Sequence, residues 1–124
     1  MKIKKVKLDI QSEDEFIRET AETMKAVAAG KRVKNDSVLS FDSLKTMRKF
    51  ITDERLRILK TIRQYHPTSI YELAKILKRD TKNVSDDVRY LAELGLLKLE
   101  KTTDGRSRTK PVMEYEKILV EISV

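Results

Sequence analysis

The clearest pattern of apolar and polar positions lies between residues 81 and 94. Four apolar residues recur there at intervals of four, three and three: Val84, Val88, Leu91 and Leu94. This spacing places them on one face of an α-helix, which we expect to be buried. Polar side chains fall on the remaining surface: Lys82, Ser85, Asp86 and Arg89. The pattern therefore predicts a helix that packs by its apolar side and presents a charged side outward.

Two further helices are predicted directly before it. In the first, Thr52 is the expected N-cap, and Asp53 and Glu54 suit the positive end of the helix dipole. Its buried stripe contains Leu56, Leu59 and Ile62. The helix is expected to end within residues 65–67, because the residue before a proline disfavours helical backbone.

The second helix is predicted to begin at Ser69, which forms a capping box with Glu72. Its inner side carries Leu73, Ala74, Ile76 and Leu77. Residues 78–80 are few enough for a tight turn into the third helix, whose expected N-cap is Asp80 or Thr81.

After Gly95 the apolar period changes from that of a helix to that of a strand. A glycine at this position favours a left-handed helix C-cap, with Leu96 as its apolar contact. Apolar and charged residues then alternate over residues 97–100, and the dipeptide Asp104–Gly105 favours a hairpin turn. Pro111 is expected near the start of the return strand or at a sheet edge. The pattern predicts a β-hairpin.

The N-terminal part of the chain is predicted to add a strand and a helix. Residues 6–10 alternate as in a half-buried strand, and Ser12 with Glu15 forms a further capping box. Gly30 is a suitable end for this helix, and residues 31–36 form a polar linker. The apolar stripe of the helix contains Phe16, Ile17, Ala21, Met24, Val27 and Ala28. A short helix from about Asp42 and a last strand over residues 118–124 are also expected.

Composition restricts the function classes. The 124 residues include 27 Lys and Arg against 20 Asp and Glu, and the net charge of +7 favours an anionic partner such as nucleic acid. There is no cysteine, and the single histidine, His66, lies in a predicted turn, so no metal or other cofactor is expected. With no phosphate loop and no nucleophile motif, we expect no enzyme activity. No apolar run reaches the length of a membrane span, so a cytoplasmic location is expected.

The segments 69–77, 78–80, 84–87 and 90–97 together resemble winged helix-turn-helix regulators. The ending YLAELGLL at residues 90–97 is similar to that of MarR-like and ArsR-like repressors. Residues 41–59 with this core resemble small prokaryotic predicted regulators, some of them antitoxin-like. ArsR-like metal sites need Cys or His clusters, which this chain lacks, so the resemblance does not extend to metal sensing.

The resemblance implies an α+β fold with a three-helix core and a β-hairpin wing. It implies that the helix over residues 81–93 reads the DNA major groove and that the hairpin over 101–110 touches the neighbouring backbone. We divide the chain into residues 1–36, an extension for dimerisation with its linker, and residues 37–124, the DNA-binding domain with the C-terminal strand.

The candidate DNA-binding residues lie on this helix and hairpin. Arg89 and Lys82 suit guanine edges or phosphates, whereas Asp86 either accepts from a cytosine amino group or orients these two cations. Two alternatives remain open, namely an ordinary solvated helix face and a solubilised hairpin tip. The full set is Thr81, Lys82, Asn83, Ser85, Asp86, Arg89, Lys101, Arg106, Arg108 and Lys110.

The expected function is sequence-specific binding of double-stranded DNA by a transcriptional regulator, more often a repressor than an activator. Because operators of such modules are usually symmetric, we expect a homodimer. Its interface is expected on the terminal strands and on Phe16, Ile17, Ala21, Met24 and Val27. In the alternative, these elements pack on their own domain, with residues 6–10 pairing with 118–122. Two other functions remain open: a protein-interaction module, such as an antitoxin that binds a toxin, and recognition of structured RNA.

Overall fold

The computed structural model of the protein describes residues 5–10, 17–18, 21, 38–102, 105 and 107–123. Within these residues the chain is α+β, as expected, with four helices and five strands in two small sheets. Two compact units are present, and each is described by itself. The helical unit is Ile51–Glu116, and the sheet unit is the described part of Lys5–Phe50 together with Lys117–Val124.

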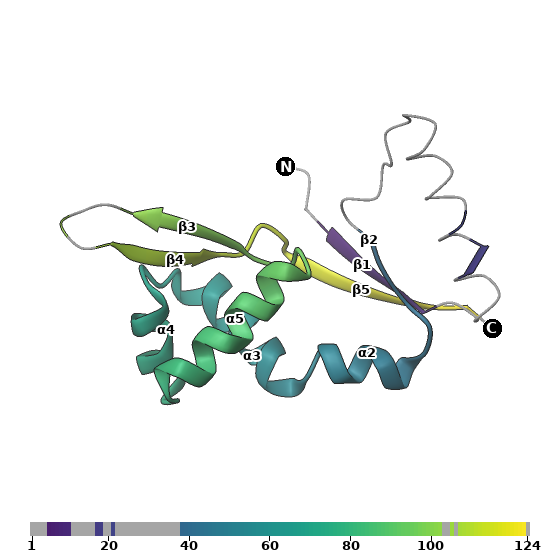
Figure 1. Cartoon of the computed structure of the whole chain (residues 1–124), viewed down its shortest axis with the longest axis horizontal. Helices are drawn as coiled ribbons and strands as arrows, with labels where there is room; N and C mark the ends of the chain where they lie inside the picture. Colours follow the sequence, from purple (N-terminus) through teal and green to yellow (C-terminus); the bar gives the residue numbers. More distant parts are fainter. Residues whose placement is uncertain are drawn as a thin grey trace. The chain divides into compact units, whose positions relative to one another are not determined.

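The helical unit contains three helices followed by an antiparallel hairpin (Figure 1). The helices are α3 (Asp53–Tyr65), α4 (Ile70–Leu77) and α5 (Thr81–Glu93). The hairpin consists of β3 (Lys98–Thr102) and β4 (Arg108–Val112). The three helices and β3 occur where the sequence predicts them, whereas β4 begins earlier than expected, at Arg108.

The apolar stripes of the three helices form the core of this unit. On α5, the predicted residues Val84, Val88 and Leu91 are fully buried, and Leu94 is half-buried. On α3 the predicted stripe is partly wrong, because Ile58 is fully buried whereas Leu56 is half-exposed. The reason is that α3 packs against α4, α5 and β4 together, so the covered face is wider than a single stripe.

Side-chain caps begin each of these helices at the predicted residues. The hydroxyl of Thr52 accepts from the backbone N–H of Arg55 at 3.2 Å, and the hydroxyl of Ser69 accepts from that of Glu72 at 3.0 Å. At α5 the cap is Asp80, the first of the two candidates. The cap of α4 differs from a capping box in one respect, because the Glu72 carboxylate accepts from the N–H and hydroxyl of Thr68. The pair Ser12 and Glu15 lies outside the described residues.

The end of α5 has the predicted left-handed cap. Gly95 has φ +82°, and its N–H donates to the carbonyl of Ala92 at 3.0 Å. The N–H of Leu96 donates to the carbonyl of Leu91 at 3.0 Å, and the Leu96 side chain is fully buried. These two bonds and the apolar contact define a Schellman motif, which turns the chain from α5 into the hairpin.

The last described pair of the hairpin is Thr102 with Arg108. The predicted turn is Asp104–Gly105, and Asp104 lies outside the described residues. Gly105 has φ +77°, as a turn glycine should. Pro111 lies near the end of β4, opposite Leu99, and is buried. Because this sheet has two strands, β4 is an edge strand, which is the second of the two expected positions.

The sheet unit contains β1 (Lys5–Ile10), β2 (Val38–Phe41), α2 (Leu44–Phe50) and β5 (Lys117–Ile122). The strand order is β2-β1-β5, and β1 is parallel to both neighbours (Figure 1). The sequence did not predict β2, because its four residues show no alternation. The pairing of β1 with β5 agrees with the alternative in which the terminal strands join within the chain, and it connects segments from both sides of the division after residue 36.

Within the part of the chain that the structure describes, no helix is long and apolar enough to span a bilayer.

Candidate nucleic-acid interface

The outer face of α5 is polar and exposed. Its buried face is fixed by Val84, Val88 and Leu91, which leaves the other side of the helix in solvent. Ser85 is half-buried at the border of the two faces. The exposed predicted residues of α5 are Thr81, Lys82, Asn83, Asp86 and Arg89. The helix therefore presents one continuous surface with hydrogen-bond donors, acceptors and two cations.

A second aspartate, Asp87, holds α5 to its neighbours. Its carboxylate accepts from Arg55 of α3 at 3.2 Å and from Arg79 of the α4–α5 turn at 3.2 and 3.3 Å. The guanidinium of Arg55 also lies 4.1 Å from the ring centre of Tyr90, a cation–π contact. Asp87 is therefore a structural residue. These contacts fix the rotation of α5 and hence which residues face outward.

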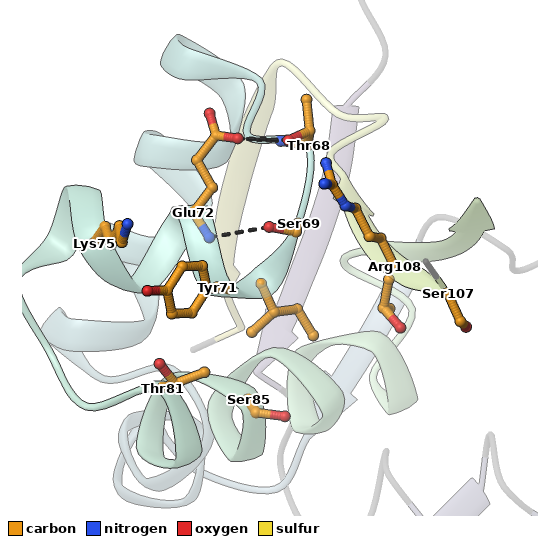
Figure 2. Close-up of a pocket in the computed structure, with 11 residues that line it drawn as sticks. Thr68, Ser69, Tyr71, Glu72, Lys75, Thr81, Ser85, Ser107 and Arg108 are labelled. Carbon is orange, nitrogen blue, oxygen red and sulfur yellow. Dashed lines mark hydrogen bonds between the residues drawn. The ribbon is translucent and has the colours of Figure 1, made fainter. Parts of the chain in front are cut away.

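A hollow with a volume of about 610 Å³ lies beside the outer face of α5 (Figure 2). It is bounded by the start of α4, the first turns of α5 and the beginning of β4. Figure 2 shows Thr81 and Ser85 on α5, Tyr71 on α4 and Arg108 on the hairpin around the same space. Segments that are distant in the sequence thus share one concave surface.

Nine of the eleven residues that line this hollow carry a hydroxyl group or a positive charge. The cations are Lys75, whose ammonium lies 4.6 Å from the ring centre of Tyr71, and Arg108, which is exposed. The hydroxyl-bearing residues are Thr68, Ser69, Tyr71, Thr81, Ser85, Ser107 and Thr109. Hydroxyls and cations are the side-chain groups that bind phosphate oxygens in nucleic-acid complexes.

One carboxylate, that of Glu72, also lines the hollow. The two hydrogen bonds from Thr68 lower the pKa of Glu72, and the nearby charge of Arg108 adds to this effect. Its negative charge stands in the first turn of α4, where it stabilises the helix end. The carboxylate therefore has a structural reason to be present beside the two cations of the hollow.

The basic residues of the hairpin differ in their positions. Lys101 is opposite Thr109 and so shares its side of the hairpin, whereas Lys110 is opposite Glu100, which offsets its charge. Lys98 is bound to Glu114 at 2.7 Å, and this carboxylate raises the pKa of Lys98. Of the predicted hairpin residues, Arg108 alone lines the hollow, and Arg106 lies outside the described residues.

The structure brings together three of the predicted residues, Thr81, Ser85 and Arg108, and adds others that the sequence interpretation missed. The missed residues are Thr68, Ser69, Ile70, Tyr71, Glu72, Lys75, Ser107 and Thr109. The sequence predicts Ser69 as the N-cap of α4. Its position at a helix N-terminus, where anions bind, was a signal that could have identified it as a site residue. The contribution of α4 depends on how this helix lies against α5, which no sequence spacing specifies.

Other predicted positions lie elsewhere or are not described. His66 is an exposed C-cap of α3 with φ +48°. Among the described residues, no group of three or more His, Cys, Asp or Glu side chains is placed to hold a metal ion. Of the predicted dimer residues, Ile17 is 59% exposed and Ala21 is exposed. Phe16, Met24 and Val27 lie outside the described residues.

Comparison with known proteins identifies a family and no individual relative. The family model HVO_A0114 matches residues 50–120, which is more than half of the chain and includes all of the hollow. No curated protein and no solved structure matches the chain.

Proposed function

The chain belongs to the HVO_A0114 family, a name that states no activity, and we propose from its own geometry that it is a sequence-specific regulator that binds double-stranded DNA. In this proposal α3, α4, α5 and the β3–β4 hairpin form a winged helix-turn-helix, with α5 as the recognition helix. Such a regulator acts in the cytoplasm by occupying a promoter, and we expect it to repress. The proposal assigns no catalytic group, metal or cofactor to the site.

The observation that carries the proposal is the outward face of α5. On the inner side of α5, Val84, Val88 and Leu91 are fully buried. On the other side, Lys82, Asp86 and Arg89 are exposed. An exposed polar helix held from behind by two other helices is the arrangement with which helix-turn-helix proteins enter the major groove. There Arg89 and Lys82 suit guanine edges, and Asp86 suits a cytosine amino group.

The hollow supports the proposal by providing a place for the DNA backbone beside the groove. With α5 in the major groove, the adjacent phosphodiester strand would lie in the hollow. There it would meet Lys75 of α4 and Arg108 of the hairpin from two sides. The hydroxyls of Thr81 and Ser85 would complete this set of donors. Such contacts determine orientation on the duplex and add affinity that does not depend on sequence.

The two sets of contacts can be separated by experiment. A preferred duplex would first be selected from a random pool, and binding then measured by fluorescence anisotropy at several salt concentrations. Arg89→Ala should weaken binding to the selected duplex by about 1–3 kcal/mol and reduce discrimination at one base pair. Arg108→Ala should weaken binding to all duplexes and reduce the salt slope by about one. For the double change with Arg106, we expect a larger effect of the same kind.

A matched control is Arg63→Ala. It removes the same charge from the same unit, but Arg63 pairs with Glu116 at 3.2 Å and does not line the hollow. We expect nearly parental binding by this variant. If all three variants bind alike, or if a duplex RNA competes as well as DNA, the proposal is wrong. The antitoxin alternative depends on an apolar face that lies mostly outside the described residues.

A further inference from the structure

The outer strand of the sheet unit, β5, carries apolar side chains that its own sheet does not cover. Leu119, Val120 and Ile122 are 44%, 50% and 53% exposed. In the parallel register, Val120 lies beside Leu8 and Ile122 beside Ile10, yet Leu8 and Ile10 are only 1% and 6% exposed. The apolar face is therefore covered at β1 and open at β5.

Within the described part of the chain, one side of β5 has no strand beside it. Among the described residues, β1 is its one strand neighbour, so β5 ends the order β2-β1-β5. An edge strand exposes a row of N–H and C=O groups, and monomeric proteins usually protect such edges with proline, bulges or inward charges. β5 contains no proline and exposes apolar residues on both of its faces. These properties are typical of a strand in the interior of a sheet.

The charge pattern of β5 indicates which partner completes the sheet. Lys117 and Glu121 are each two residues from Leu119. In an antiparallel pairing of two β5 strands with Leu119 on the two-fold axis, Lys117 of each copy lies opposite Glu121 of the other. Ile118 then lies opposite Val120. The sequence KILVEI is thus complementary to itself in charge and in apolar character.

We propose that β5 pairs antiparallel with β5 of a second copy, with the two-fold axis at Leu119, to form one continuous sheet across a homodimer. The contact is isologous, as a two-fold axis requires. It uses a different unit from the DNA-binding surface, so the two proposals can fail separately. Glu121 also pairs with Lys7 of its own chain and remains 59% exposed, which leaves it accessible to the second lysine.

A charge-exchange experiment tests both the surface and the register. In Lys117→Glu, both residues of each cross-copy pair are acidic, and in Glu121→Lys both are basic. Each variant alone should dimerise at least about tenfold more weakly than the parent, because like charges lie directly opposite each other. A mixture of the two variants restores opposite charges in both pairs and should form heterodimers. Analytical ultracentrifugation of each variant and of the mixture gives the result.

Cysteine substitution provides an independent measurement, because the parent chain has no cysteine. In Leu119→Cys, the two new residues lie opposite each other at about 4.5–5.5 Å between Cα atoms, within the range of a disulfide. In the matched control Lys117→Cys, the two residues are offset by four positions, about 13 Å along the strand, and should not link. The proposal is overturned if the parent is monomeric at tens of micromolar, if the mixture does not associate, or if the control variant links as readily as Leu119→Cys.

Discussion

The helical unit and the sheet unit bury their apolar residues to different extents. In the helical unit, Val84, Val88 and Leu91 are fully buried, and the outer face of α5 is charged. In the sheet unit, Leu119, Val120 and Ile122 stay about half exposed on β5. A surface of cations and hydroxyls suits a hydrated anionic ligand, whereas an apolar strand edge suits another polypeptide. The comparison suggests that the two units bind different kinds of partner.

Removal of an apolar side chain should have the largest effect, and it should differ between the units. Leu91→Ala leaves a cavity in the core of the helical unit and should lower the free energy of unfolding by about 2–5 kcal/mol. Leu119→Ala is a change of the same type at a residue that is 44% exposed. It should cost the monomer less than about 1 kcal/mol but weaken the dimer. Urea unfolding and sedimentation would measure both; equal losses of stability would contradict the comparison.

The two adjacent aspartates of α5 provide the next test. Asp87→Ala removes the acceptor of Arg55 and Arg79 and should lower the free energy of unfolding by about 1.5–3 kcal/mol. Asp86→Ala affects an exposed side chain and should change the free energy of unfolding by at most about 0.5 kcal/mol. It should instead alter the preferred DNA sequence. Thermal unfolding and binding to the selected duplex distinguish the two roles. If Asp86→Ala is the more destabilising change, the assignment of the faces of α5 is wrong.

A smaller effect is expected at the end of α5. Gly95 has φ +82°, and a Cβ added there meets no atom within 4 Å. Gly95→Ala should therefore destabilise the helical unit through backbone strain alone, by about 1–2 kcal/mol. Ala92→Gly, a control within the same helix, should cost about 0.5–1 kcal/mol through backbone entropy. A loss much greater than about 2 kcal/mol for Gly95→Ala would mean that the glycine is closely packed.

The smallest expected effect is a dependence on pH at the start of α4. The hydrogen bonds from Thr68 lower the pKa of Glu72 in the folded protein below its ordinary value of 4.5. Its contribution to stability is thus present above pH 4.5 and is lost as the pH falls through the lowered pKa. In Glu72→Gln this part of the acid sensitivity should be absent. Thermal melts of both proteins across this pH range test it; identical acid profiles would contradict the assigned cause.

The structure agrees most closely with the sequence where the signals are local. Thr52, Ser69 and Asp80 cap the helices as predicted, since a cap depends on hydrogen bonds to residues two or three positions ahead. The Schellman motif at Gly95 was predictable for the same reason. The candidate site was predictable in part. Thr81, Ser85 and Arg108, three of the predicted residues, line one hollow, but the α4 residues that complete it were missed.

The sequence by itself determined the order of the elements of the helical unit, the ends of its helices, and the inward and outward faces of α5. These features depend on spacings within a few residues. Tertiary structure alone decided three other features. They are the parallel pairing of β1 with β2 and β5, the meeting of Lys75 and Arg108 around one hollow, and the exposure of the β5 edge. Each depends on which distant segments come into contact. Burial of apolar surface drives such contacts, and because it is not directional, it does not specify the partner segments from sequence spacing.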